Sequence, residues 1–434
     1  MKEPLKRAIG PTYHTLARIF RAAATRVFRW TVDAARGLHL IPRSKDAPGS
    51  PPRLLVISLT HHIGDSIMLL PMLERLRSAN PDATIECAVE ETMAPLFRLI
   101  PVVDRVHSLD LGGRLPANLS MELGRMWKMV REYWRTMRRL EVPDVCIAAR
   151  WPDDLFRDRA LGYMVGATRR IGYASTVASS SRPAPYRDAL LSEAYAGGNG
   201  LHESERFCLL PVRAGLAPES SLEDVVSAPL QSLLAVAESV DWKALTQRLG
   251  LQPDRPFAVI APGASKPVRR WPLERWLPVA DLLKQHGLSI VILSGPGDVA
   301  IGKELSGSLG DGAILIAGTT TFVETVALLS HARIFLGNDS GPGHVAGALG
   351  IPTLTIFVSL RNSDADGYSS VTRIHPLGPE TAFVTPSACI APCTDFCRET
   401  TTVHCIQNVS EDAVLQETAR LLRASKEQPC RELP

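Results

Sequence analysis

The sequence lacks any long apolar run. No stretch of its 434 residues approaches the ~20 apolar residues that a membrane-spanning helix needs. The N-terminal segment also lacks the uninterrupted apolar core of a signal peptide, because Arg18, Arg21, Arg26 and Arg29 recur along it. We therefore expect an unprocessed, cytoplasmic protein.

A strong charge of either sign is missing as well. The 48 basic and 45 acidic residues give a net charge of +3, which by itself does not indicate a nucleic-acid binder. The charge is uneven, however: residues 1–45 hold ten basic and two acidic residues, net +8, and the other 38 basic and 43 acidic residues give −5. A basic arm on a mildly acidic body predicts an anionic partner, either membrane phospholipid or nucleic acid.

Helical spacing in the basic arm separates apolar from charged residues. Seven residues fall on one stripe: Leu16, Phe20, Ala23, Val27, Trp30, Ala34 and Leu38. Arg18, Arg21, Arg29 and Arg36 fall on the opposite side. This pattern is typical of a helix that lies in a membrane interface, so an anionic membrane surface is the predicted partner and no nucleic acid is expected. The alternatives are a helix packed on its own domain and an arm without fixed structure.

Beyond the arm, apolar strand-like runs alternate with helical segments. Residues 1–52 comprise the arm and a linker rich in Pro, Gly and Ser, while residues 53–240 and 241–434 each carry an α/β series. The expected strands are Leu54–Leu59, Thr84–Val89, Arg105–Leu109, Val145–Ala148, Phe257–Ile260, Ser289–Leu293, Ile314–Ile316, Ile334–Leu336 and Thr353–Val358. The expected helices are Ser66–Ala79, Leu119–Leu140, Val236–Leu249, Leu273–Gln285, Phe322–Ser330 and Gly343–Leu349; Ala174–Gly200 is expected to be a long surface loop. The alternation predicts an α/β fold with two Rossmann-like domains facing a cleft, which the loops after the strands should line.

The loop Thr60–Asp65 joins the first strand to a helix. Asp65 lies near the start of that helix, where its carboxylate can face the cleft or can serve only as a helix cap. His61 and His62 are adjacent in this loop and are expected to point apart, which argues against a metal site.

Two loops of the second domain differ in the ligand that their residues predict. Ala261–Lys266 leads to Arg269 and Arg270, so three cations gather between a strand end and a helix start; such a site attracts phosphate, although a solvated basic loop is the alternative. Ser294–Asp298 resembles a dinucleotide fingerprint only superficially. Its third glycine is missing and a proline occupies a variable position, so we reject NAD binding.

The loop Gly337–His344 has the most specific pattern. Its glycines allow close approach of the backbone to a ligand, and the free amides at the start of the following helix can cradle an anion. It lacks the Gly-Lys-Ser/Thr ending of a nucleotide-hydrolysing P-loop. We therefore expect phosphate binding here rather than a mere tight turn.

Three motifs occur in a specific order along the chain: Gly64-Asp65-Ser66 followed by Pro71, the stretch Pro262–Trp276, and Asn338–His344. Together they resemble glycosyltransferase family 9, the heptosyltransferases of lipopolysaccharide core assembly. The resemblance runs from about residue 53 to about residue 425 and leaves the basic arm and linker outside.

This resemblance implies the glycosyltransferase B architecture, a metal-independent reaction without cofactor, and inverting transfer of heptose from ADP-heptose to the lipopolysaccharide inner core. It makes Asp65 the catalytic base, with Gly64 and His62 on the acceptor side. The donor-binding residues that it implies are Ser265, Lys266, Arg269, Asp298, Asp339, Ser340, Gly341, Gly343 and His344. Arg269 stands where characterised members commonly carry Lys, so its contact with phosphate or sugar can differ.

The partners implied are a nucleotide-sugar donor and a lipid-linked glycan acceptor, with the protein peripheral on the inner membrane. Two alternatives stay open. One is a related transferase that uses another nucleotide sugar or another envelope glycan acceptor, and the other is a non-catalytic glycan-binding homologue.

Two features stand apart from these motifs. Cys389, Cys393, Cys397 and Cys405 are spaced C-x3-C-x3-C-x7-C, with His404 adjacent. They could bind zinc, but the two-residue spacing of the commonest zinc motifs is absent. Members of the family that the sequence resembles often carry a cysteine-containing tail here, so we expect a structural role, and no metal ligands are predicted in the active site. His202 and Glu203 precede a helical segment and are assigned no role.

Overall fold

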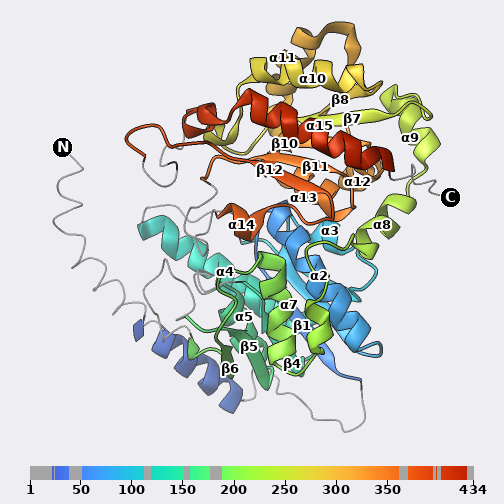
Figure 1. Ribbon diagram of the computed structural model, residues 1–434. Helices are drawn as coiled ribbons and strands as arrows, with labels where there is room; N and C mark the ends of the chain where they lie inside the picture. Colours follow the sequence, from blue (N-terminus) through green and yellow to red (C-terminus); the bar gives the residue numbers. More distant parts are fainter. Residues whose placement is uncertain are drawn as a thin grey trace.

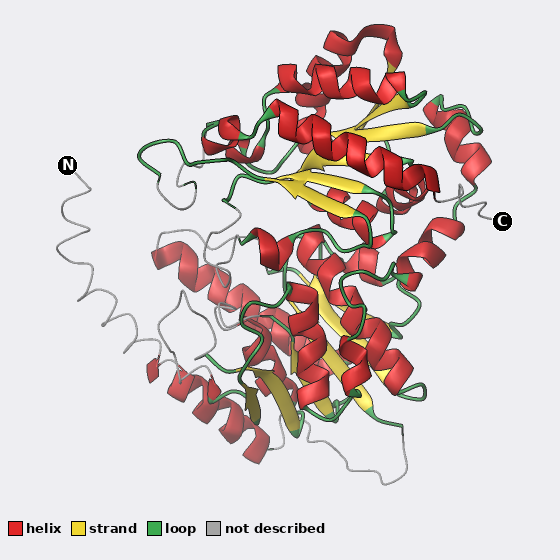
Figure 2. Ribbon diagram, in the orientation of Figure 1, coloured by secondary structure: helices red, strands yellow, loops and turns green. Residues whose placement is uncertain are grey.

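The computed structural model describes residues 22–23, 25–38, 51–111, 119–150, 157–175, 188–360, 370–393, 397 and 402–427. Within them, two six-stranded parallel sheets form two α/β domains, one above the other in Figures 1 and 2. The predicted fold class, two Rossmann-like domains, is confirmed.

The first sheet has the order β3-β2-β1-β4-β5-β6. Its strands are β1 (Arg53–Ser58), β2 (Thr84–Glu90), β3 (Arg105–Leu109), β4 (Val145–Ala148), β5 (Arg169–Tyr173) and β6 (Glu193–Tyr195). The accompanying helices are α2 (Ile63–Ala79), α3 (Ala94–Phe97), α4 (Leu119–Arg139), α5 (Arg157–Val165) and α7 (Glu203–Arg213), followed by the 3₁₀ turn η1 (Glu219–Leu222).

The second sheet has the order β12-β11-β10-β7-β8-β9. Its strands are β7 (Phe257–Ala261), β8 (Ser289–Ser294), β9 (Ala313–Ala317), β10 (Ile334–Asn338), β11 (Thr353–Ile356) and β12 (Thr381–Val384). Its helices are α10 (Trp276–Gln285), α11 (Val299–Leu309), α12 (Phe322–Ser330), α13 (Gly341–Ala348), α14 (Val371–Ile374) and α15 (Glu411–Glu427). The 3₁₀ turns are η2 (Pro267–Arg269), η3 (Leu273–Arg275), η4 (Pro296–Asp298), η5 (Gly310–Gly312) and η6 (Cys405–Asn408).

In both sheets, the second and third strands lie on one side of the first strand, and the later strands lie on its other side. Counted from its own first strand, each domain has the strand order 3-2-1-4-5-6, with the switch between β1 and β4 in one sheet and between β7 and β10 in the other. Ligands of open parallel sheets bind outside the carboxyl ends of the strands at this switch point. The loops after β1, β7 and β10 therefore occupy the expected ligand position of their sheets.

Each sheet is buried on both faces. Along β1, Leu54 and Val56 belong to one apolar cluster, whereas Leu55 and Ile57 belong to another on the opposite face. This alternation follows from the two-residue period of a strand, and it explains why the strands are continuous apolar runs. The cluster that contains Leu54 continues into the second domain through α13, where it includes Val345. The two domains consequently share buried apolar surface where α2 meets α13 (Figure 1).

Several predicted elements differ from the structure. The helix expected at 236–249 is two helices, α8 (Gln231–Glu238) and α9 (Trp242–Leu249), because Asp241 caps a new start by accepting a hydrogen bond from Ala244 N at 3.0 Å. The expected loop 174–200 contains β6, and its residues 176–187 lie outside the described part. Helix α13 begins two residues earlier than predicted, since proline at position 342 is tolerated in a first turn.

The basic arm contributes a described helix over residues 25–37, the dark blue helix at the lower left of Figure 1. It packs on the first domain through Thr25, Phe28, Val32 and Ala35, which lie opposite the apolar stripe predicted from the sequence. Tyr163 anchors it by donating a hydrogen bond to Asp33 at 2.8 Å.

Two arginines of the arm, Arg36 and Arg29, sit over the ring of Tyr163, at 4.8 and 5.8 Å from its centroid. The alternative of a helix packed on its own domain is therefore observed, but with the arginine-bearing side inward. Its stripe residues from Ala23 to Leu38 are exposed. Leu16, Phe20, Arg18 and Arg21 lie outside the described residues, as does the linker up to residue 50.

Candidate active site

One cavity of about 650 Å³ lies between the domains, at the two switch points. The loops after β1, β7, β8 and β10 line it. The predicted site residues among its lining are His62, Gly64, Asp65, Ser265, Lys266, Arg269, Asp298, Asp339, Ser340, Gly341 and His344. Gly343 is not part of the lining: it packs on the sheet, where an added Cβ would lie 3.3 Å from the Phe335 ring and from Thr355 Oγ1. The structure thus brings together all but one of the residues predicted for the site.

Asp65 lies in the first turn of α2 and points into the cavity. Its Oδ2 accepts a hydrogen bond from Thr60 Oγ1 at 2.9 Å and lies 3.9 Å from Arg150 Nη2. Neither contact is with a helix amide, so the alternative of a mere helix cap does not describe this carboxylate. Arg150 also donates to Leu59 O at 3.3 Å, which fixes the guanidinium beside the strand end.

The two adjacent histidines lie together, contrary to the prediction. The ring centroids of His61 and His62 are 4.2 Å apart, and both rings line the cavity. The expectation failed because the chain turns from extended backbone into α2 at His62, which is the N-cap residue. Successive side chains point apart only while the strand geometry continues.

Two arginines that follow the loop after β7 form ion pairs with two different carboxylates. Arg269 Nη1 lies 2.9 Å from Asp339 Oδ2, and both side chains reach the cavity. Arg270 instead turns away, donating to Ala264 O at 2.9 Å and to Asp298 Oδ1 at 3.1 Å. Lys266 and Arg269 are therefore the cations of this loop that line the cavity.

Asp298 has a close neighbour that explains a glycine in the β7 loop. An added Cβ at Gly263 would lie 2.4 Å from Asp298 Oδ2, a contact that a side chain cannot make. Burial raises the pKa of the Asp298 carboxyl, although the Arg270 charge opposes this shift. The glycine and the ion pair together place the loops after β7 and β8 against each other.

Asn338 joins the two loops at the switch point, and sequence reasoning gave it no separate role. It is fully buried at the end of β10. Its Nδ2 donates to Pro262 O at 2.6 Å and its Oδ1 accepts from Trp271 N at 3.1 Å. A buried amide with both functions satisfied fixes the relative position of the segments it bridges. The sequence pattern that could have identified Asn338 is a polar residue at the end of an apolar strand.

His344 brings the two domains into contact at the site. An added Cβ at Gly64 would lie 2.7 Å from its ring, so glycine is required for α2 to approach α13 this closely. Burial lowers the pKa of His344, while the carboxylates of Asp339 and Asp65 oppose the shift. His344 Nδ1 and Ser340 Oγ are among the buried polar atoms of the described residues without a hydrogen-bond partner, and because both residues line the cavity, both groups can bind a ligand there.

A second contact between the domains lies at the start of α7. His202 Nδ1 accepts a hydrogen bond from Ser204 N at 3.2 Å, and its Nε2 contacts His375 O at 2.8 Å. Burial lowers the pKa of His202 to about 3, so the ring is neutral and serves as cap and bridge. Beside it, Arg373 Nε donates to Glu203 Oε2 at 2.5 Å. This pair joins α14 to α7.

Sequence reasoning missed three charged residues of the cavity lining: Arg150, Glu203 and Arg373. Arg150 follows β4, the neighbour of β1 at the switch point, so the rule that placed Asp65 could have found it. No sequence pattern marks Arg373, whose short helix α14 precedes β12. Chemically, the cavity combines a carboxylate that can take a proton with the two cations of the β7 loop and with helix amides that can bind an anion.

Comparison with known proteins agrees with this arrangement. The model of glycosyltransferase family 9 (heptosyltransferase) matches residues 154–383. Lipopolysaccharide heptosyltransferase 3 of Escherichia coli is 30% identical over 157 residues, covering 34% of this chain and 46% of that protein, so the chain spans about half the length of this relative. Lipopolysaccharide heptosyltransferase 1 of Pseudomonas aeruginosa is 27% identical over 316 residues, covering 70% and 78%.

A solved structure supports the fold. The Escherichia coli heptosyltransferase WaaC with ADP superposes with a TM-score of 0.62 at 17% identity, over 85% of this chain and 99% of that chain. The two α/β domains therefore have the glycosyltransferase B architecture. Since the family model matches more than half of the sequence, the chain belongs to glycosyltransferase family 9.

Proposed function

We propose that this protein transfers heptose from ADP-heptose to the lipopolysaccharide inner core, with inversion at the anomeric carbon. One observation carries the proposal: Asp65 of the first domain and Lys266 and Arg269 of the second line the same cavity. The family description and the ADP in the related Escherichia coli heptosyltransferase support this choice of sugar and nucleotide.

Asp65 acts as the general base. Its Oδ2 is held by Thr60, and its Oδ1 makes no hydrogen bond to the described residues, so Oδ1 is the atom that receives the proton. The acceptor hydroxyl oxygen forms a bond to the anomeric carbon while its proton passes to Asp65. The bond from that carbon to the diphosphate breaks on the opposite face, which inverts the configuration. Such base catalysis is worth about 10²–10⁴-fold.

The departing ADP carries the charge of the broken bond on its terminal phosphate. Arg269, positioned by Asp339, and Lys266 neutralise this charge, and the amides at the start of α13 donate hydrogen bonds to it. These groups supply the electrostatic stabilisation that a metal ion supplies in other phosphate sites. We therefore propose a metal-independent reaction.

A donor panel tests this function. Purified full-length protein is incubated with core lipopolysaccharide lacking heptose and with ADP-heptose, ADP-glucose or UDP-glucose, in the presence and absence of EDTA. Release of ADP and a mass gain of one heptose, both resistant to EDTA, are expected only with ADP-heptose. Transfer from another donor, strict dependence on Mg²⁺, or an unchanged core mass in cells lacking the gene would each contradict the proposal.

We further propose that the protein works at the cytoplasmic face of the inner membrane, with the arm helix on anionic lipid. On that helix Val27, Trp30 and Leu38 are 64%, 74% and 70% exposed and form one stripe with Ala23 and Ala34. Arg26 lies exposed beside them. An exposed apolar stripe with a cation beside it matches an interfacial helix, and a lipid-linked acceptor gives such binding a purpose. No helix in the described ranges is long and apolar enough to cross a bilayer.

Vesicle co-sedimentation tests the arm. The full chain is mixed with vesicles of phosphatidylglycerol and phosphatidylethanolamine, and Trp30→Ser with Leu38→Ser is expected to reduce binding at least about tenfold, given ~25 cal/mol per Å² of apolar surface. Trp134→Ser is the matched control, since Trp134 is an exposed indole on α4. Equal binding of all variants, or preferential binding of the wild type to duplex DNA, would overturn the membrane role.

A further inference from the structure

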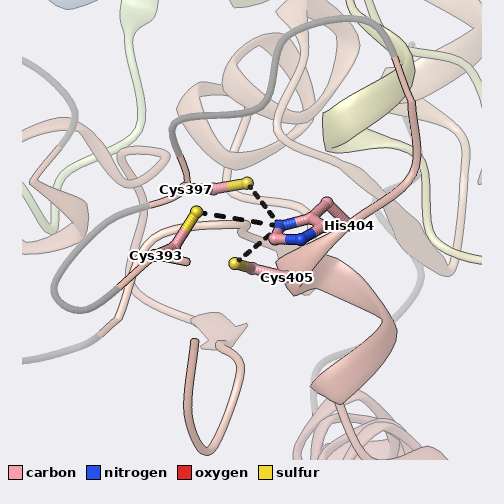
Figure 3. A group of neighbouring side chains, drawn as sticks. All are labelled: Cys393, Cys397, His404 and Cys405. Carbon is pink, nitrogen blue, oxygen red and sulfur yellow. Dashed lines mark hydrogen bonds between the residues drawn. The ribbon is translucent and has the colours of Figure 1, made fainter. Parts of the chain in front are cut away.

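Three thiols and an imidazole converge between the end of β12 and the first residue of η6. Figure 3 shows Cys393, Cys397 and Cys405 around the ring of His404, with their sulfur atoms near its Nδ1. The Sγ–Nδ1 distances are 3.8, 3.6 and 3.3 Å, respectively. All four atoms lie within 4.8 Å of one another. None of these residues lines the cavity between the domains.

These distances match the edges of a tetrahedron around one small ion. A zinc ion binds thiolate sulfur at about 2.3 Å and imidazole nitrogen at about 2.0–2.1 Å, which places S and N about 3.6 Å apart across a tetrahedral angle. The S–N separations therefore fit a shared zinc ion, and the sulfur atoms, which lie within 4.8 Å of one another, need only draw closer together to bind it. Three sulfurs and one nitrogen form a closed four-ligand set, which is the arrangement of structural rather than catalytic zinc.

The donor atoms select the metal. Thiolates bind zinc strongly, whereas Mg²⁺ and Ca²⁺ prefer oxygen ligands, and no carboxylate belongs to this cluster. Ile390 N also donates a hydrogen bond to Cys405 Sγ at 3.3 Å. Amide donors to sulfur stabilise a metal-bound thiolate and orient it.

The four residues of the cluster are buried to different degrees, and this difference is compatible with a metal site. Cys405 is fully buried and Cys393 nearly so, while Cys397 and His404 are half-buried. The first two ligands are therefore fixed by the protein core, and the other two leave a path for the ion. The backbone supports the same shape, because Cys393 N donates to Ile390 O at 2.9 Å.

We propose that Cys393, Cys397, His404 and Cys405 bind one structural Zn²⁺. This site goes beyond the transfer reaction and is separate from its metal-independent chemistry. On binding, the three thiols lose their protons and the neutral His404 ring donates the lone pair of Nδ1.

The zinc site lies next to the segment that carries the cationic loop of the cavity. The ligand Cys405 begins η6, and η6 packs against η2, the turn that carries Arg269. Trp271 Nε1 donates to Val409 O at 3.2 Å, and Arg275 Nη1 donates to Gln407 O at 2.8 Å. Zinc that fixes η6 consequently fixes the backbone on which the cationic loop rests.

Metal analysis of the full-length protein tests the proposal. Protein purified under reducing conditions without chelator is analysed by inductively coupled plasma mass spectrometry, and one zinc per chain is expected. Cys397→Ser should reduce the zinc content at least about tenfold. Cys389→Ser is the matched control, because Cys389 lies in the same segment but outside the four-residue cluster.

Cobalt substitution tests the metal site in the wild-type protein, so the result does not depend on whether a variant folds. Wild-type protein loaded with Co²⁺ should show the intense visible bands and the thiolate charge-transfer band of tetrahedral cobalt, and zinc should abolish them. His404→Ala should shift these bands, while Cys389→Ser should leave them unchanged.

Other outcomes would overturn the site. These are metal-free wild type, iron in place of zinc, octahedral cobalt spectra, or loss of metal in Cys389→Ser but not in His404→Ala. Because zinc content is measured without any glycosyl transfer, failure of the zinc site and failure of the proposed reaction are distinguished.

Discussion

The two domains hold their cavity-lining groups in different ways. In the first domain, Asp65 is held by one hydroxyl at 2.9 Å and by a guanidinium at 3.9 Å. In the second, Asn338, the Arg269–Asp339 pair and the Arg270–Asp298 pair interlock the loops after β7, β8 and β10. The contrast indicates a preorganised anion site facing a base that has freedom to receive an acceptor hydroxyl.

The largest expected effect concerns the first domain. Asp65→Ala and Asp65→Asn should lower kcat by about 10²–10⁴-fold, because the acceptor proton loses its base, while ADP affinity stays within about twofold. Turnover is measured as ADP release, and affinity by isothermal titration calorimetry. Wild-type turnover in either variant would remove Asp65 from its catalytic role.

The second domain is tested by Arg269. Arg269→Met should raise the donor KM about 10–100-fold, since a charge-assisted hydrogen bond contributes about 1.5–3 kcal/mol and Asp339 loses its partner. Arg269→Lys should retain most of the affinity, because the positive charge remains. The exposed Arg255 provides the control Arg255→Met. If Arg269→Met binds ADP as the wild type does, the anion site lies elsewhere.

Preorganisation of the second domain is tested by Asn338. Asn338→Leu keeps the size of the side chain but leaves Trp271 N and Pro262 O unpaired, at about 1–3 kcal/mol for each buried group. The free energy of unfolding, measured in urea, should fall accordingly, and Gln252→Leu at an exposed position should leave it within about 0.5 kcal/mol. An unchanged unfolding free energy would show that the interlocking of the loops does not depend on Asn338.

The smallest expected effect is on the free energy of unfolding and depends on pH. It concerns His202, which joins the two domains through His375 O. The pKa of His202 is about 3 in the folded protein and about 6.5 when unfolded. The unfolded chain therefore binds the extra proton as pH falls below about 6.5, so stability present above that pH is lost progressively towards about pH 3.

Replacing His202 removes this loss. His202→Gln should show a smaller decrease in unfolding free energy than the wild type between about pH 7.5 and about pH 5.5, in urea titrations at both values. Other buried histidines, such as His344, are common to both proteins and cancel in the difference. Parallel pH profiles would mean that folding does not lower the pKa of His202.

The sequence predicted what local patterns determine. Nine of the twelve described strands were predicted from apolar runs, whereas β5, β6 and β12 were missed. The loops that carry Asp65, Arg269 and Asp339 were singled out because they follow predicted strands, but the roles of these residues came from the resemblance to family 9. The resemblance to family 9, which the family model confirms, rested on the same loops.

The sequence did not predict contacts between distant segments. The bridge from Glu203 to Arg373 joins helices of different domains, and the His61 and His62 rings come together only because the backbone turns between strand and helix. The direction in which the arm helix faces was likewise set by tertiary packing. Phe28 and Val32 proved to be the inner face because Tyr163 offers them a surface.

The close packing of Gly64 on His344 has an electrostatic consequence. It brings the N-termini of α2 and α13 together, with Ile63 and Gly341 at the contact. Each N-terminus carries about half a positive charge from the aligned peptide dipoles, so the two ends repel each other. Asp65, in the first turn of α2, offsets part of this repulsion, and a diphosphate bound between the helices would offset more. The leaving group would thereby hold the domains together, and its release would allow them to separate.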